Sequence, residues 1–154
     1  MDSIIIQETD FQKARKRISE ARKAGKEAIF SGDDDELNRK VLEKEEIDIL
    51  LLNLKARKDR MKQRDSGFNH VLAKLAKKKN VAIGINFDEI TSSGAKEKTE
   101  IIARIRQNIK LCNKNKLKMF FISPSKKALD VYSLRSLGTV LGMPTWMTRE
   151  IVNH

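Results

Sequence analysis

Short apolar runs alternate with amphipathic segments along the whole chain. The runs cover residues 3–6, 27–30, 47–52, 81–87 and 119–122, and most are rich in β-branched or aromatic side chains. Such runs are typical of buried strands, whereas the segments between them repeat apolar residues at helical spacing. About five strand–helix alternations in one chain predict an α/β fold with a mainly parallel sheet. We expect one domain over residues 1–154.

The helices are predicted from their caps and apolar stripes. Thr9 with Gln12 forms a capping box for the first helix, and Gly25 follows its end. The acidic run 33–36 suits the first turn of a second helix. Three more helices are predicted from their apolar stripes. The first has the stripe Phe68, Val71, Leu72 and Leu75, and the other two cover residues 95–112 and 127–141.

The charge balance is the compositional feature that bears most on function. The chain has 32 Lys and Arg against 21 Asp and Glu, a net charge of +11 and an isoelectric point near 9.8. A basic domain of this size favours a polyanionic partner, of which nucleic acid is the commonest. A lysine-rich surface adapted to heat is the alternative. The most basic segment, residues 55–64, follows a predicted strand, where βα loops form the functional face of α/β folds.

Other classes of protein are disfavoured by composition. No apolar run approaches the roughly 20 residues that span a bilayer, so we expect no membrane association. The N-terminus does not resemble a signal peptide, and a single cysteine, Cys112, cannot form an internal disulfide, which indicates an intracellular protein. Aromatic residues are few, which disfavours base-stacking platforms.

One stretch carries a long resemblance to a known family. Residues 64–75 read RDSGFNHVLAKL and residues 81–84 read VAIG. This pattern resembles the ribonuclease P protein component 3 family, the archaeal counterpart of the thirty-kilodalton eukaryotic subunit. The family usually has Asp where this chain has Asn69. Weaker resemblance extends over roughly residues 27–143.

The resemblance implies a barrel related to the (β/α)₈ type. A full barrel of this kind takes about 200 residues or more, so the resemblance implies a shortened TIM-barrel-like fold that lacks about two N-terminal strand–helix units. Five strands leave two outcomes open: an open sheet whose edges a partner protects, or an abbreviated closed barrel.

The resemblance also implies a function. The family's members are protein subunits of the endoribonuclease that removes the 5′ leader of precursor tRNA, with catalysis and Mg²⁺ belonging to the RNA subunit. We therefore expect no catalytic site, metal or cofactor in this chain and a cytoplasmic location. The implied partners are the ribonuclease P RNA, precursor tRNA through the holoenzyme, and protein component 2 in a two-plus-two assembly.

The candidate RNA-binding residues are basic side chains that would neutralise phosphates without reading bases. Three of them match basic positions of relatives, one precedes the family motif, and three rest on local charge. In chain order they are Arg60, Arg64, Lys78, Lys79, Lys116, Lys126 and Arg135.

Two other functions remain as alternatives. A metal-dependent phosphoesterase of a related barrel fold would need several histidines with carboxylates at strand ends, whereas this chain has only His70 and His154 beside Asp10, Asp88 and Glu89. We expect His70 on the polar face of its helix. A generic basic RNA-binding protein would bind many RNAs with similar affinity and a steep salt dependence.

Overall fold

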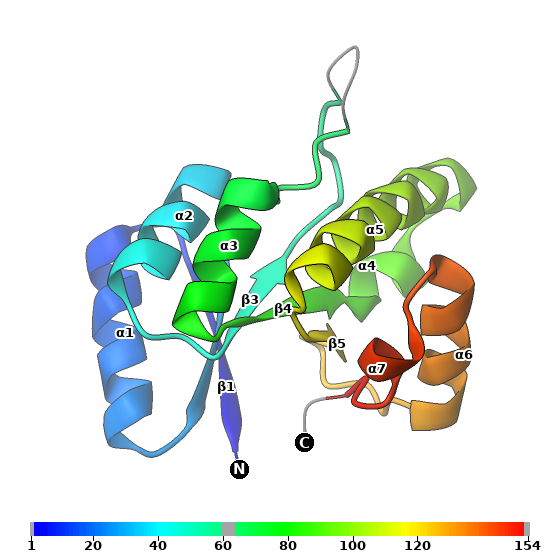
Figure 1. Ribbon diagram of the computed structural model, residues 1–154. Helices are drawn as coiled ribbons and strands as arrows, with labels where there is room; N and C mark the ends of the chain where they lie inside the picture. The colour runs from blue at the N-terminus through cyan, green and yellow to red at the C-terminus, as the bar shows by residue number, and fades with distance from the viewer. Residues whose placement is uncertain (1, 60–63, 153–154) are drawn as a thin grey trace.

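The chain folds around one five-stranded parallel sheet (Figure 1). The computed structural model describes residues 2–59 and 64–152. The strands are β1 Ser3–Glu8, β2 Glu27–Gly32, β3 Ile49–Leu52, β4 Ala82–Asn86 and β5 Met119–Ile122. Each strand pairs in parallel with the next one along the chain, giving the spatial order β1-β2-β3-β4-β5. This is the strand order of a (β/α) barrel, and it confirms the predicted α/β, TIM-barrel-like fold.

Helices fill the connections between the strands (Figure 1). They are α1 Phe11–Lys23, α2 Asp35–Lys44, α3 His70–Lys79, α4 Phe87–Ser92, α5 Ala95–Asn115, α6 Val131–Leu141 and α7 Thr145–Thr148. A parallel strand pair needs such a crossover because the chain must return to the starting edge of the sheet. The helices α1, α2, α3 and α5 therefore begin on the side of the carboxyl ends of the strands and end on the side of their amino ends, whereas α6 and α7 follow the last strand, β5.

The two faces of the sheet are buried in different ways. The large core forms between the helices and side chains such as Ile6, Phe30, Leu50 and Ile83. On the opposite face the strands contribute a separate apolar cluster of Ile29, Ile49, Leu51, Phe120 and Ile122. Because this second cluster contains strand residues alone, the sheet curves so that these side chains cover one another, as in the interior of a barrel.

Gly84 makes this interior packing possible. A Cβ atom at Gly84 would lie 3.0 Å from Leu51 Cδ1, 3.1 Å from Ile122 Cδ1 and 3.2 Å from Ile49 Cγ2. The space in front of β4 is thus filled by the side chains of β3 and β5. A larger residue in the middle of β4 would push these side chains from their positions.

The sheet is open between its first and last strands in the part of the chain that the structure describes. β1 and β5 do not pair there, and a cleft of about 570 Å³ lies between them, lined by both strands. Beside β5, Phe121 and Val152 form an isolated parallel bridge, and the Phe121 N–H donates to the Ile151 carbonyl at 2.9 Å. Of the two outcomes left by the sequence, the described residues form the open sheet, and the partner that would protect its edges stays a prediction.

Local details differ from the sequence-based expectations at helix ends. The first helix is capped by Asp10, whose carboxylate accepts from the Lys13 N–H at 3.1 Å, and not by Thr9. Val71, expected on the buried stripe, is 55 % exposed, because α3 begins at His70 and buries Leu72, Ala73 and Ala76 instead. The short helix α4 was not expected, and the last long helix begins at Val131, four residues later than predicted.

We expect Gly84→Ser to lower the free energy of unfolding by about 1–3 kcal/mol, because it overfills the interior and buries a hydroxyl among apolar side chains. Gly94→Ser is the matched control, since nothing lies within 4 Å of a Cβ there and serine is a favourable N-cap residue. Urea unfolding of both variants checks this, and equal effects of the two substitutions would contradict it.

Candidate nucleic-acid interface

The basic connection between β3 and α3 is held in place by a buried arginine. Arg104, on α5, is 1 % exposed. Its guanidinium donates to the Leu54 carbonyl at 3.0 Å, to the Arg57 carbonyl at 2.8 Å and to the Asp59 carboxylate at 3.1 Å. A planar guanidinium presents several donors in a fixed fork, so one side chain fixes three successive points of the connection.

A second arginine ties the same connection to α2 and to the turn before α3. Arg57 donates to both oxygens of Asp35 at 2.9 Å and to Asp65 at 3.1 Å. Burial alone would lower the pKa of Arg57, but these two carboxylates outweigh it and raise the pKa above its usual value. Gly67 has a φ of +69°, and a Cβ there would lie 2.5 Å from the Arg57 guanidinium. Glycine is therefore required at residue 67 for both conformation and space.

The family-like motif is thus a structural turn in this protein. Ser66 is buried, and its carbonyl accepts from the Asn108 amide at 3.3 Å. Asn69 caps α3, with its side-chain oxygen accepting from the Leu72 N–H at 2.9 Å. An asparagine oxygen accepts this bond as an aspartate oxygen would, so the cap tolerates the departure from the family pattern.

Polar side chains at the carboxyl ends of the strands bond to one another. The Asn86 amide donates to Asn53 at 2.9 Å, and the Asn53 amide donates to Ser31 at 2.8 Å. This rim lies where barrel enzymes place their active sites. Its groups are already paired across β2, β3 and β4, so they form a polar seam between strands.

The two carboxylates after β4 are also engaged by the protein. Asp88 accepts from the Ser123 hydroxyl at 2.6 Å and the Ser125 N–H at 2.8 Å, whereas Glu89 accepts from the Leu54 N–H at 2.7 Å and the Lys55 N–H at 3.2 Å. Burial acts to raise the pKa of Asp88, but the bonds from both serines and the charge of Lys127 hold it below its ordinary value. Burial raises the pKa of Glu89 despite the two N–H bonds.

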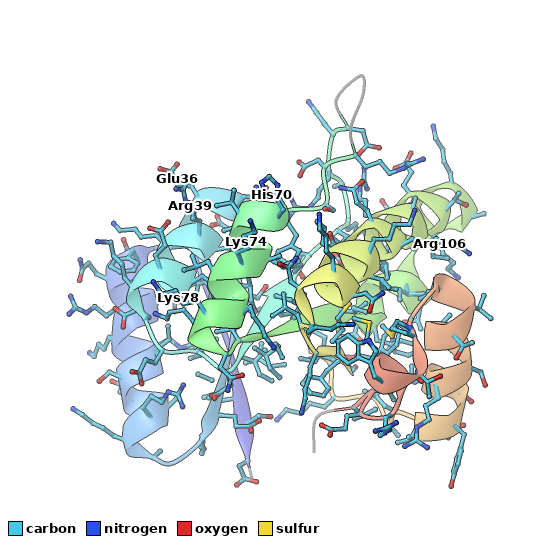
Figure 2. The ribbon with its side chains drawn as sticks, viewed as in Figure 1. Glu36, Arg39, His70, Lys74, Lys78 and Arg106 are labelled. Atoms are coloured by element: carbon cyan, nitrogen blue, oxygen red, sulfur yellow. The ribbon has the colours of Figure 1, made fainter. Side chains whose placement is uncertain are left out.

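A metal site of the phosphoesterase kind is not formed by the described residues. Within residues 2–59 and 64–152, no group of three or more His, Cys, Asp or Glu side chains could hold a metal ion. His70 is exposed on α3, as predicted for its polar face (Figure 2). Cys112 is fully buried, and burial raises the pKa of its thiol, so it is a core residue.

The candidate RNA-binding residues differ in how free their side chains are. Lys78 is exposed on α3 without a partner among the described residues (Figure 2). Its neighbour Lys79 donates to the Glu43 and Glu45 carbonyls at 3.3 and 3.1 Å, which ties the end of α3 to the end of α2. Arg135 similarly donates to the Thr148 and Arg149 carbonyls at 3.2 and 3.1 Å.

The remaining candidates lie at both ends of the sheet. Lys116 ends α5 in the left-handed conformation, with its Nζ 5.5 Å from the centre of the Trp146 ring. Lys126 is exposed after β5 beside the cleft, and Arg64 forms a 3.6 Å ion pair with Asp59. Arg60 lies outside the described residues. The candidates therefore do not gather in one cluster, since Lys78, Lys79 and Lys116 lie at helix ends remote from Lys126 and Arg64.

Further basic residues, missed by the sequence analysis, lie exposed on the helices. Their side chains make no hydrogen bond, ion pair or ring contact in the part of the chain that is described. On α3 and α5 they are Lys74, Lys96, Lys110 and Lys114. A signal for them is legible in the sequence. No Asp or Glu occurs in residues 66–87 or in residues 101–129, so lysines inside these segments lack an acid close to them in the sequence. In the fold, Lys118 and Lys127 still reach Glu150 and Asp88.

The chain matches the model of a family described as "RNase P subunit p30" over residues 3–154. It is 27 % identical to ribonuclease P protein component 3 of Methanococcus maripaludis over 86 % of this chain and 53 % of the relative. It is 26 % identical to the protein of the same name from Methanothermobacter thermautotrophicus over 91 % of this chain and 54 % of the relative. The chain thus spans about half the length of these curated relatives.

The fold also resembles a chain from a cryo-EM structure of archaeal ribonuclease P with mature tRNA. The TM-score is 0.76 at 24 % identity, covering 97 % of this chain and 63 % of that chain. At 24 % identity this structural similarity is evidence for the fold alone. Among the described helices, none is both long and apolar enough to be a membrane span. The sequence analysis expects this chain to lack about two N-terminal strand–helix units of a full barrel, and this stays a prediction.

We expect Arg104→Met to lower the free energy of unfolding by about 1–3 kcal/mol, because two carbonyls of the β3–α3 connection lose their donor. Cleavage of residues 53–67 by a protease should also become faster. Arg106→Met, two residues along the same helix, is the control, since Arg106 is exposed and makes only a 3.5 Å bond to the Val140 carbonyl. Loss of stability in both variants alike would contradict the role of Arg104.

We expect Asp88 and Glu89 to contribute oppositely to the pH dependence of stability. Asp88 stabilises the fold above its ordinary pKa of 3.8, and this contribution is lost as pH falls through its lowered pKa. Glu89 binds a proton more tightly when folded, so stability declines as pH rises from 4.5 through its raised pKa.

Urea unfolding of Asp88→Asn and Glu89→Gln at a series of pH values tests this. The free energy of unfolding of Asp88→Asn should be lower than that of the unsubstituted chain at neutral pH, and this difference should shrink toward acid pH. The free energy of unfolding of Glu89→Gln, relative to the unsubstituted chain, should increase as pH rises above 4.5. If the free energy of unfolding changed with pH in the same way in all three proteins, the predicted opposite contributions of Asp88 and Glu89 would be contradicted.

Proposed function

Because the chain belongs to the ribonuclease P subunit family described as p30, we propose that it serves as a protein subunit of ribonuclease P. In this role it binds and stabilises the catalytic RNA in the holoenzyme that removes the 5′ leader of precursor tRNA. The family match over residues 3–154 is the observation that carries the proposal. The relatives named component 3 and the archaeal ribonuclease P chain of similar fold support it.

The charge of the chain supports RNA binding through phosphates. The net charge is +11, and several exposed lysines have no partner within the described residues. Lysine is a compact charge on a flexible stem, suited to phosphate oxygens and not to reading base edges. Neutralising phosphates lets RNA helices approach each other closely, and this would raise the folded fraction of the RNA.

We assign the chemistry of cleavage, with its Mg²⁺, to the RNA subunit. The carboxylates Asp88 and Glu89 are occupied by hydrogen bonds within this chain, and the rim of Ser31, Asn53 and Asn86 is paired internally. These groups would have to break protein bonds before serving a metal or a substrate. The chain itself then contributes binding and no catalytic residue or cofactor.

The proposed phosphate contacts come from the basic residues identified in the sequence. Lys78, Lys116 and Lys126 have exposed side chains, and Arg64 keeps half of its side chain accessible beside Asp59. Lys79 and Arg135 also brace backbone carbonyls, so their contacts would use only the donors left over. Arg60 belongs to the proposal through its place in the basic segment before the motif.

Family resemblance further supports protein component 2 as a partner, in a two-plus-two assembly in the cytoplasm. The unpaired edge of β1, and the part of β5 that is not bridged to Val152, would suit a protein partner, because unpaired strand edges are normally covered or paired. Activity measurements distinguish the two alternative functions from this one. A phosphoesterase would hydrolyse small phosphate esters with added Mn²⁺ or Zn²⁺. A generic RNA-binding protein would not stimulate cleavage by one particular RNA.

We expect this chain to stimulate precursor-tRNA cleavage by its cognate ribonuclease P RNA at modest Mg²⁺, in the presence of component 2. The variant Lys78→Ala/Lys116→Ala/Lys126→Ala should lose most of the stimulation, because three phosphate contacts are removed. The control variant Lys13→Ala/Lys16→Ala/Lys23→Ala changes the same net charge on α1. Absence of stimulation where the other subunits are active would overturn the proposed function.

A further inference from the structure

The positive charge of the chain is concentrated in its second part. Residues 1–65 hold 16 basic and 15 acidic residues, whereas residues 66–154 hold 16 basic and six acidic residues. The net charges of the two parts are thus +1 and +10. The two acid-free segments named above, residues 66–87 and 101–129, include all of α3 and most of α5.

The fold brings these two segments together. α3 and α5 pack against each other, and the C-terminal end of α5 lies beside α3 (Figure 1). Six lysines are exposed on the two helices. Lys77 donates to the Lys116 carbonyl at 3.1 Å, and Lys96 lies in the first turn of α5, outside the acid-free segment. The other four are Lys74 and Lys78 on α3 and Lys110 and Lys114 on α5, and we call them the lysine face. None of these four side chains makes a hydrogen bond, ion pair or ring contact with a described residue. Figure 2 shows Lys74 and Lys78 on the side of α3 that is turned away from the sheet.

The arginines of the first part are used differently. On α1 and α2 they form ion pairs: Arg15 with Glu45, Arg17 with Glu8, Arg22 with Asp48 and Arg39 with Glu43. The positive charge of these arginines is thus largely neutralised by acidic residues of the same chain. The charges of the lysine face have no such acidic partners, and like charges close together lower stability unless a polyanion is bound.

We infer that the lysine face binds the phosphate backbone of double-helical RNA. This rests on the proposed function and adds to its phosphate contacts the outer surface of α3 and α5. On each helix the two lysines stand four residues apart, about 6 Å along the axis. Their charges therefore stand on rigid elements, as needed to follow a backbone of fixed shape.

The chemistry of this surface favours duplex over single-stranded RNA. Lysines contact phosphates without base readout, and A-form RNA displays its backbones across a wide, shallow minor groove. Single strands are usually bound by stacking bases on exposed aromatic rings. No Phe, Tyr or Trp occurs on α3 or α5, and the one ring exposed there is the imidazole of His70, the first residue of α3. Trp146, beside the end of α5, is partly buried and covered by Lys116, with its ring N–H donating to Asn113 at 3.0 Å.

The test is the affinity of the full chain for a duplex RNA of about 16 base pairs, measured at several salt concentrations. The variant replaces the lysine face by glutamine: Lys74→Gln, Lys78→Gln, Lys110→Gln and Lys114→Gln. The control removes the same net charge from exposed lysines on and just after α1: Lys13→Gln, Lys16→Gln, Lys23→Gln and Lys26→Gln. None of the eight side chains makes a hydrogen bond, ion pair or ring contact among the described residues, so all variants should fold, and circular dichroism verifies this.

We expect the lysine-face variant to bind the duplex about tenfold or more weakly, with the slope of log affinity against log salt reduced by about 3. The α1 control should keep most of the affinity, and a single strand of the same length should bind the unsubstituted chain more weakly than the duplex.

Equal losses in the two variants, preference for the single strand, or equally tight binding of polyglutamate would each overturn the inference and leave the ribonuclease P function standing. Failure of the unsubstituted chain to bind any RNA would overturn the inference together with the RNA-binding role.

Discussion

The buried guanidinium of Arg104 is the interaction on which the rest of the surface depends. It joins α5 to three points of the β3–α3 connection, across up to 50 residues of sequence. A buried positive charge is tolerated only when its donors are satisfied, so the connection must adopt this conformation whenever α5 is packed on the sheet. Its position in turn sets the turn at Gly67 and the start of α3, and thereby the direction in which the α3 lysines project.

The curved sheet provides a barrel-like scaffold without a barrel enzyme's site in the described residues. Its interior is filled by apolar side chains around Gly84, and the polar groups at the carboxyl ends of the strands bond to each other. Folds of this type host many unrelated functions, since function belongs to the site and not to the architecture. Here four exposed and unpaired lysines lie on the outer helices α3 and α5, away from the edge of the sheet where barrel enzymes place their active sites.

Arginine and lysine divide their tasks in this protein. Arg57, Arg104 and Arg135 hold carbonyls and carboxylates of the chain itself, and the arginines of α1 and α2 pair with acids. A rigid, planar fork of donors is suited to such fixed contacts. Lys74, Lys78, Lys110 and Lys114 remain in solvent. Most fixed contacts of positive side chains are therefore made by arginine, with Lys79 as an exception, whereas the unpaired charge of the lysine face is lysine.

The sequence by itself determined the α/β class, the five strands, the family motif and the excess of positive charge, because periodicity, composition and a contiguous motif are local properties. It also held the acid-free segments 66–87 and 101–129, although their meaning required knowing that α3 and α5 are neighbours. Only the tertiary structure decided that Asp10 caps α1, that Val71 is exposed and that Lys79 and Arg135 brace carbonyls. It alone showed the open sheet and the buried Arg104, since contacts between residues 45 or 50 positions apart depend on how helices pack and not on any local pattern.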